Sequence, residues 1–176
     1  RGFFFHLYLF SSQDQQTVDR HFDWMQDYGL DGVWLSRFVV GVANHPTNVL
    51  MNVRNAAHRT GRTFALAYDL SGQSTNTLFT RLTNDWRWLV DNLHLTDDPR
   101  YLHHNGKPVL MIRGFCADGF CTNLAHQIID YFKTDPSYGV TMVGGGGGLA
   151  RRRRGLGEKP GMALLVVGCR PRRTRS

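Results

Sequence analysis

Three charged side chains come at the ends of short apolar runs, where a β-strand would deliver them to one edge of a sheet. Arg37 belongs to "GVWLSRF", Asp69 to "FALAYDL" and Arg113 to "VLMIRGF". The Asp69 carboxylate could accept hydrogen bonds from a ligand or polarise a catalytic group. It could equally cap the loop "SGQSTN" that follows it. Arg37 and Arg113 could hold Asp69 through charge-assisted hydrogen bonds.

The neighbouring titratable side chains are weaker candidates. Tyr68 precedes Asp69, so alternation along a strand predicts that it points to the opposite face, toward helices. His103 and His104 are adjacent and cannot easily share one ligand geometry. They precede an Asn-Gly turn, which favours a solvated loop.

The cysteines do not form a recognisable framework. Cys116, Cys121 and Cys169 are an odd number, and no second Cys or His pair stands at zinc-ligand spacing from them. We therefore expect no zinc site and no disulfide-stapled fold, with the cysteines as free thiols or a loop disulfide. No metal or organic cofactor is indicated elsewhere in the sequence.

Apolar runs alternate with segments of helical period. The predicted strands are residues 3–10, 32–38, 64–70, 109–115 and 139–143. The predicted helices run from an N-cap at Asp14 to Gly29, from Pro46-Thr47 to Gly61, along the stripe Leu78 to Leu93, and along Leu124 to Phe132. Trp86 falls in the third apolar stripe, so we expect it in the core.

Strand and helix repeat every thirty-odd residues, which is typical of parallel βα units. No G-x-G-x-x-G follows the first strand, which weakens a dinucleotide-binding interpretation. A complete (β/α)₈ barrel takes about 250 residues. We therefore predict the α/β class, with a partial (β/α)₈ TIM-type barrel of about five βα units over residues 1–145.

The charge of the chain is concentrated in its last segment. From Leu149 to Ser176 there are nine Lys or Arg and one Glu, whereas the first 148 residues hold 12 bases and 13 acids. A P-loop needs Lys-Ser/Thr after its glycines, and Leu149-Ala150 stand there instead. Residues 146–176 are then either a disordered basic arm or the product of a shifted reading frame or splice junction. Their Gly, Arg, Ala and Pro bias and lost periodicity favour the second interpretation.

Nothing in the sequence predicts a membrane span, because no apolar run approaches the roughly 20 residues that cross a bilayer. The first run, "GFFFHLYLF", is short and lacks a small-residue cleavage site, so we interpret it as a buried strand rather than a signal peptide. The chain starts at Arg1 rather than at Met, which suggests that its beginning is missing.

A resemblance to a known family extends over roughly Leu9 to Gly145. It rests on three blocks in order: "LFSSQDQQTVDRHFDWMQDYGLDGVWLSRFV", "AAHRTGRTFALAYDLSG" and "NDWRWLVDNLHLTDDPRYLHHNGKPVLMIRGF". These resemble the glycoside hydrolase family 99-like proteins, often labelled xylosidase/arabinosidase-type, which are distantly related to the endo-α-mannosidases of family 99 and the α-glucanases of family 71.

The resemblance implies a (β/α)₈ barrel that acts on α-linked sugars or related glycans. It makes carbohydrate the expected partner. The strand-end positions of Asp69, Arg37 and Arg113 then make them candidate substrate-binding residues, although family members often carry Trp where Arg113 stands. It also implies a catalytic Glu-x-x-Glu near the last strand. The single Glu of the chain, Glu158, lies in the divergent tail, so no catalytic residue can be assigned.

The sequence thus predicts a fragment of a glycoside hydrolase-like protein that acts on glycans and is inactive as this chain. A polyanion- or nucleic-acid-binding protein that uses the basic tail, residues 149–176, is the alternative. A third possibility is a non-catalytic sugar-binding module that uses Arg37 and Asp69. Unpaired strand edges in a partial barrel further predict poor solubility or molten behaviour.

Overall fold

The structure is a computed structural model that describes residues 11–114, 122–145 and 164–167. The four α-helices are α1 (Gln15–Asp27), α2 (Asn48–Thr60), α3 (Thr75–Leu93) and α4 (Thr122–Thr134), with short 3-10 helices η1 (Val39–Gly41) and η2 (Leu95–Asp97). The strands are β1 (Gly32–Phe38), β2 (Thr63–Asp69), β3 (His103–His104), β4 (Lys107–Arg113), β5 (Thr141–Gly145) and β6 (Leu164–Val167).

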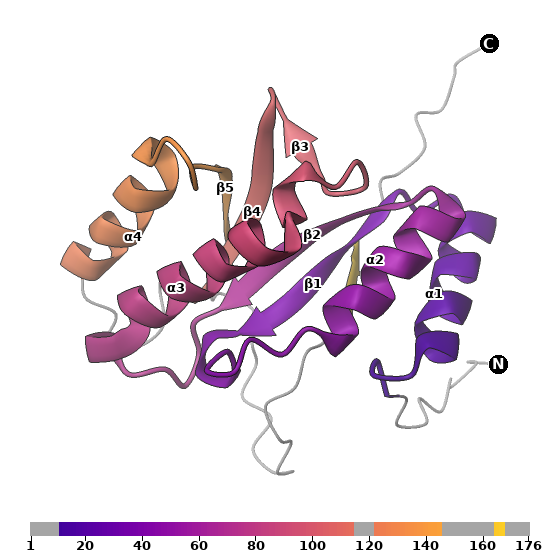
Figure 1. Ribbon diagram of the computed structural model, residues 1–176, viewed down its shortest axis with the longest axis horizontal. Helices are drawn as coiled ribbons and strands as arrows, with labels where there is room; N and C mark the ends of the chain where they lie inside the picture. The colour runs from indigo at the N-terminus through magenta and orange to yellow at the C-terminus, as the bar shows by residue number, and fades with distance from the viewer. Residues whose placement is uncertain (1–10, 115–121, 146–163, 168–176) are drawn as a thin grey trace, which may run out of the picture.

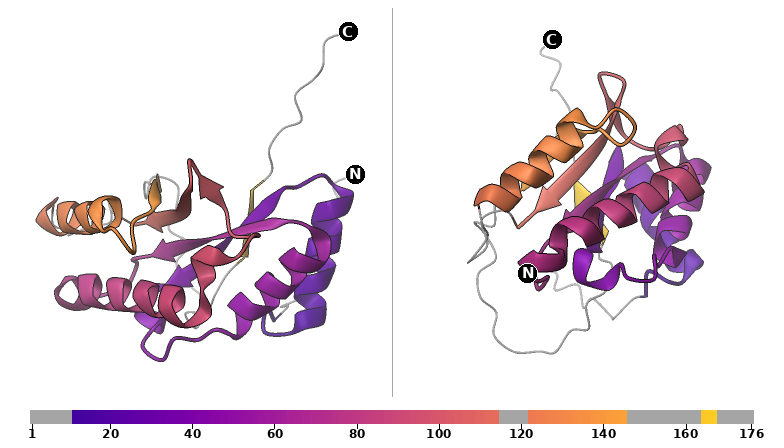
Figure 2. Two further views of the ribbon diagram at one scale, coloured as in Figure 1. Left: turned by 45° about the horizontal axis from the view of Figure 1, so that its top comes forward. Right: turned by 60° about the vertical axis from the view of Figure 1, so that its left-hand side comes forward.

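The main sheet is built mostly of parallel strands. β1, β2, β4 and β5 are parallel and adjacent in chain order, while β6 pairs antiparallel with the outer edge of β1 and β3 pairs antiparallel with β4. All four helices cover the same face of this sheet (Figures 1 and 2). Successive adjacent strands with helices on one face form part of a (β/α) barrel, whereas a doubly wound sheet carries helices on both faces. The predicted fold class is therefore confirmed.

The first two helices begin and end where the sequence predicts. Asp14 caps α1, because its carboxylate accepts hydrogen bonds from the backbone N–H groups of Gln16 and Thr17 at 3.3 and 3.2 Å. Gly61 ends α2 in the left-handed conformation, with φ of 72°. These local signals position the helices before any tertiary contact is considered.

The core lies between the helices and the sheet. α3 contributes a buried stripe at helical spacing, and the predicted core residue Trp86 is fully buried. Its indole Nε1 donates a hydrogen bond to the backbone carbonyl of Tyr138 at 3.0 Å, so its polar atom is satisfied inside the core. Leu35, Leu66 and Ile112 approach the same core from the sheet.

The predicted Asn-Gly turn forms, but the two histidines before it are in a strand rather than a loop. Asn105 and Gly106 have φ of 50° and 76°, the positive values that a two-residue type I′ hairpin requires. That turn pairs His103 with Pro108 and His104 with Lys107 in a β3–β4 hairpin. Both histidine side chains are exposed, as predicted.

Two parts of the sequence prediction concern residues that the structure does not describe, or describes only in part. The strand expected over residues 3–10 lies outside them, as do Cys116, Cys121 and Cys169. Within the tail, β6 is described, and its register pairs Gly32 with Val167 and Leu35 with Leu164. The division of the chain at residues 145 and 146 stays a prediction.

Candidate functional site

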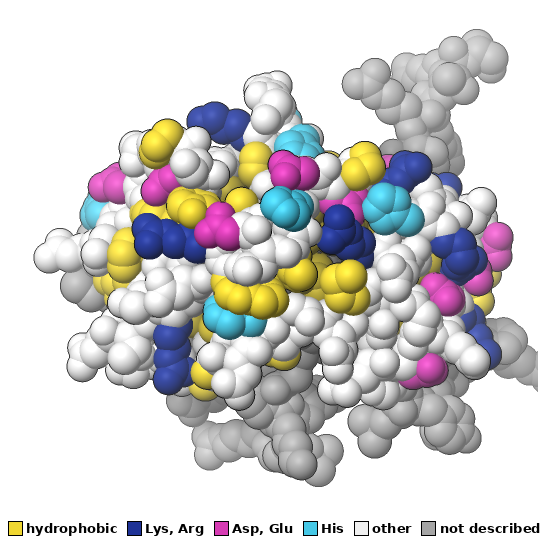
Figure 3. All heavy atoms as spheres, in the orientation of Figure 1, with side chains coloured by type: hydrophobic (Ala, Val, Ile, Leu, Met, Phe, Trp, Pro, Cys, Tyr) yellow, Lys and Arg dark blue, Asp and Glu magenta, His cyan; other side chains and the backbone are white. Residues whose placement is uncertain are grey.

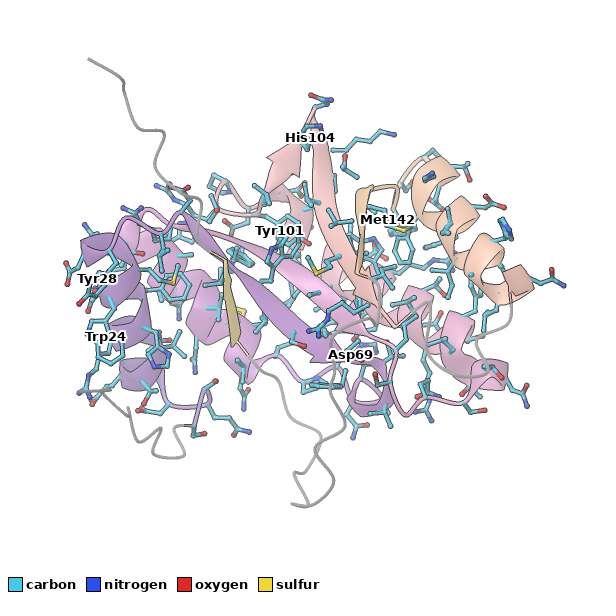
Figure 4. The ribbon with its side chains drawn as sticks, turned by 180° about the vertical axis from the view of Figure 1, so that it is seen from behind. Trp24, Tyr28, Asp69, Tyr101, His104 and Met142 are labelled. Carbon is cyan, nitrogen blue, oxygen red and sulfur yellow. The ribbon has the colours of Figure 1, made fainter. Side chains whose placement is uncertain are left out.

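A row of three side chains lies where the parallel strands end. The register pairs Phe38 of β1 with Asp69 of β2, and Asp69 with Arg113 of β4. Residues paired in this way share one face of the sheet, and we call Phe38, Asp69 and Arg113 the strand-end row. Figure 4, seen from behind, shows Asp69 at the arrowheads of the strands, on the side away from the helices.

The alternation along β2 decides which face Asp69 occupies. Tyr68 is fully buried on the helix side, where its hydroxyl donates a hydrogen bond to Asp85 of α3 at 2.6 Å. Asp69 is the next residue, so it points to the opposite face, as the sequence predicted for this pair. Its side chain is partly exposed.

Asp69 uses one carboxylate oxygen within the fold. Its Oδ1 accepts a hydrogen bond from the backbone N–H of Ser71 at 2.9 Å, which caps the turn after β2. Its Oδ2 has no hydrogen-bond partner among the described residues. The capping role and a ligand-binding role foreseen for Asp69 are therefore compatible, because they require different oxygens.

Arg113 presents an exposed guanidinium beside Asp69. Within the described ranges, it forms no side-chain hydrogen bond or ion pair, with Asp69 or with any other residue. Its backbone carbonyl accepts a hydrogen bond from the N–H of Leu70 at 3.1 Å. At the next residue, Gly114, φ is 100° and an added Cβ would lie 3.3 Å from the Cβ of Leu70. The backbones of β2 and β4 are thus held together at the site while the Arg113 side chain stays unpaired.

Arg37 does not join the row, so the expected pairing of Arg37 with Asp69 is wrong. The register pairs Arg37 with Tyr68, which places both on the helix side of the sheet. Arg37 is 1% exposed, and its Nε and Nη2 each donate to an oxygen of Asp85 at 2.6 Å. Its Nη1 donates to the backbone carbonyl of Pro46 at 2.7 Å.

A cluster behind the row contains Arg37, Asp85 and Tyr68, which are buried, and His45, which is partly exposed. Burial disfavours the charged form of Arg37, but its hydrogen bond to Asp85 and the nearby charges outweigh burial and hold its pKa above the ordinary value. Burial, and then the charge of Asp85, raise the pKa of Tyr68 well above its ordinary value. His45 Nδ1 lies 2.9 Å from Asp85 Oδ1, and its ring stacks on Trp88 at 4.7 Å. The cluster fastens α3 to the ends of β1 and β2.

Two residues of this region, Asp85 and Phe38, were not predicted from the sequence, although the sequence around each indicates its placement. Asp85 falls between Leu82 and Leu89 in the buried stripe of α3, and an acid on the apolar side of a helix indicates a buried partner. Phe38 ends its apolar run one residue after Arg37, so the same strand that buries Arg37 must turn Phe38 to the other face. Phe38 is partly exposed.

The amino ends of the strands have a different character. On the face that carries the row, a hollow of about 350 Å³ is lined by Trp34, Val109, Thr141 and Val143 together with the start of the β3–β4 hairpin. Val109 precedes Arg113 by four residues of β4, which separates the two by about 13 Å at the usual rise of a strand. In barrels the amino ends serve stability and the carboxyl ends carry the site.

The described residues hold no group of three or more His, Cys, Asp or Glu side chains that could bind a metal ion. In the part of the chain that the structure describes, no helix has the length and apolar character needed to cross a membrane.

The fold is similar to that of solved glycoside hydrolases. One is the GH99 endo-alpha-mannosidase from Bacteroides thetaiotaomicron, at a TM-score of 0.57 and 16% identity, over 79% of this chain and 40% of that chain. Another is the complex of that enzyme with BIS-TRIS-propane, at a TM-score of 0.56, 16% identity and 42% of that chain. No protein-family model and no curated protein sequence matches the chain.

The chain thus spans about two fifths of the length of these mannosidase structures. At this identity, the likeness shows a GH99-like, glycoside hydrolase-like barrel fold, of which the described strands form a part. It agrees with the part of the sequence resemblance that concerns the fold.

Proposed function

We propose that this chain is part of a glycan-acting, glycoside hydrolase-like barrel and that it binds carbohydrate at the strand-end row. The observation that carries the proposal is the placement of Phe38, Asp69 and Arg113 side by side at the carboxyl ends of parallel strands. Ligands of barrel enzymes bind at that end of the strands. The similar solved structures are of a mannosidase, which supports a carbohydrate ligand.

The three side chains offer complementary contacts to a sugar ring. The partly exposed ring of Phe38 is suited to pack against the apolar C–H face of a sugar. The unpaired Oδ2 of Asp69 would accept a hydrogen bond from a hydroxyl, and the Arg113 guanidinium would donate to another oxygen. Because Asp85 and the backbone bonds after β2 and β4 fix the strand ends, the row would be preorganised for its ligand.

We further propose that the chain does not hydrolyse glycosides. Glycoside hydrolysis normally uses two carboxyl groups on either side of the scissile bond. The strand-end row supplies one, Asp69, and the only Glu of the chain is Glu158, outside the described residues. The finer assignment to the xylosidase/arabinosidase-type, family 71-related proteins rests on the sequence resemblance and is part of the proposal.

The test is a titration of the isotope-labelled 176-residue chain with a panel of methyl α-glycosides, followed by amide chemical shifts. We expect Asp69→Asn and Phe38→Ala to weaken binding at least tenfold each. The matched controls Asp27→Asn and Tyr28→Ala change an exposed carboxylate and an 80% exposed ring at the C-terminal end of α1, on the helix side of the sheet, and should leave binding unchanged. Binding that survives Asp69→Asn and Phe38→Ala together would refute the row as the site.

A polyanion-binding role of the tail is the second candidate, favoured by the nine Lys or Arg after residue 148. The helix-covered face in Figure 3 intersperses basic with acidic side chains, so the body offers little for a polyanion there. Replacing Arg151 to Arg154 by Gln leaves the β6 sequence intact and should abolish salt-dependent retention on heparin. Unchanged retention would dispose of this candidate.

A further inference from the structure

We propose that Arg113 makes the strand-end row selective for acidic sugars, with the carboxylate of a hexuronic acid paired to its guanidinium. The inference rests on the proposed carbohydrate site and deepens it by naming the substrate class. Its basis is an exposed arginine that, in the described part of the chain, has no partner of its own at the edge where a ligand would bind.

Arg113 differs in its pairing from three other arginines of the described residues. Arg37 and Arg54 direct their guanidinium groups to Asp85 and Asp98, and Arg59 pairs with Asp23. Arg113 keeps all its donors available for a ligand, within the described residues. A guanidinium is always charged, and its planar fork matches a carboxylate through two parallel N–H···O bonds. A neutral sugar can use the donors but not the charge.

The position of Asp69 sets the orientation of such a ligand. Neighbouring strands lie about 4.8 Å apart, so the two paired residues can reach one sugar ring together. The Asp69 carboxylate repels an acidic group and accepts hydroxyl donors, while Arg113 attracts the acidic group. The uronate carboxylate therefore belongs on the Arg113 side and the ring hydroxyls on the Asp69 side. A reversed orientation would bring two carboxylates together.

The experiment compares methyl α-glucuronide with methyl α-glucoside on the full chain, by amide chemical-shift titration at low salt and with added NaCl. We expect at least tenfold tighter binding of the glucuronide at low salt, and a smaller preference at high salt because screening weakens the ion pair. Arg113→Gln should make the two affinities equal, and Arg113→Lys should keep part of the preference. The matched control Arg20→Gln removes an exposed charge from α1 and should keep all of it.

The outcomes separate this inference from the proposed function. Equal binding of the two sugars by the unaltered chain overturns the acidic preference and leaves the carbohydrate site standing, whereas binding of neither overturns both. A glucuronide preference that persists in Arg113→Gln overturns the role of Arg113. Glucose 6-sulfate distinguishes the acidic groups: binding as tight as that of the glucuronide overturns the assignment to a carboxylate. If Arg113→Gln loses its dispersed spectrum, Arg113→Lys and the salt series decide in the same way.

Discussion

Arg37 and Arg113 stand near the ends of two parallel strands and have opposite environments. Arg37 is 1% exposed and bound to Asp85, whereas Arg113 is exposed and, among the described residues, unpaired. Arg37 is paired in register with Tyr68, and Arg113 with the next residue, Asp69. A difference of one residue in register moves a side chain from the helix side of the sheet to the face away from the helices, which carries the strand-end row. An arginine near the end of a strand therefore cannot be assigned to the site until the pairing register of its strand is known.

The two arginines also contribute to the protein in different ways. Arg37 belongs to a buried cluster whose members satisfy one another, so we assign it to the stability of the strand ends. The Arg113 side chain forms no hydrogen bond or ion pair among the described residues, and we propose that it serves a ligand rather than the fold.

Removing each arginine should affect stability very differently. Arg37→Met leaves the Asp85 carboxylate buried with its strongest partner gone, and we expect the free energy of unfolding to fall by about 3–5 kcal/mol. Arg113→Met should change it by about 0.5 kcal/mol or less. Urea denaturation followed by circular dichroism measures both. Equal losses for the two variants would contradict these different roles.

A double variant keeps the prediction testable if Arg37→Met alone does not fold. If Arg37→Met does not fold, Arg37→Met combined with Asp85→Met removes the unpaired charge and should recover part of the stability, because a buried pair can be replaced by apolar side chains of similar volume. If the double variant recovers no stability, the loss came from packing around Arg37 rather than from the unpaired Asp85 carboxylate.

Tyr68→Phe should produce an intermediate effect. The variant deletes the hydroxyl that donates to Asp85 at 2.6 Å but leaves Arg37 and His45 in contact with the same carboxylate. We expect a loss of about 1.5 kcal/mol, typical of one hydrogen bond to a charged group. The same denaturation series measures it. A loss as large as that of Arg37→Met would show that the hydroxyl, rather than the guanidinium, holds the cluster together.

The alkaline range should show the smallest and most gradual effect. Burial raises the pKa of Tyr68 well above its ordinary value of 10.0, and burial also raises the pKa of Tyr101. The unfolded chain therefore loses these protons first, and stability that is fully present below about pH 10 falls as the pH rises above it. Tyr68→Phe should make that fall shallower. Tyrosinate absorbance and denaturation midpoints between neutral and alkaline pH measure the effect, and an unchanged slope would contradict it.

Much of the fold was predictable from the sequence because it depends on local signals. The bounds of β1, the Asp14 cap, the Gly61 stop and the burial of Trp86 follow from periodicity and capping residues. β3 has only two residues, too few for a period. β6 depends on pairing with β1, which lies far away in the chain.

The site was predictable only in part. Asp69 and its opposition to Tyr68 follow from alternation within one strand, which a sequence reveals. The position of Arg37 depends on the register between β1 and β2 and on Asp85 of α3, which are tertiary facts. The same register places Phe38 next to Asp69, and no local sequence pattern indicates that pairing.

We propose that a sugar binds at the carboxyl edge of the sheet and not on its helix-covered face. Mapping glycan-induced amide shifts on the full chain tests this claim directly. We expect the largest shifts on Phe38, Asp69, Ser71 and Arg113, and we expect them to disappear in Asp69→Asn. Shifts that concentrate on α1 to α4, or that persist in that variant, would contradict it.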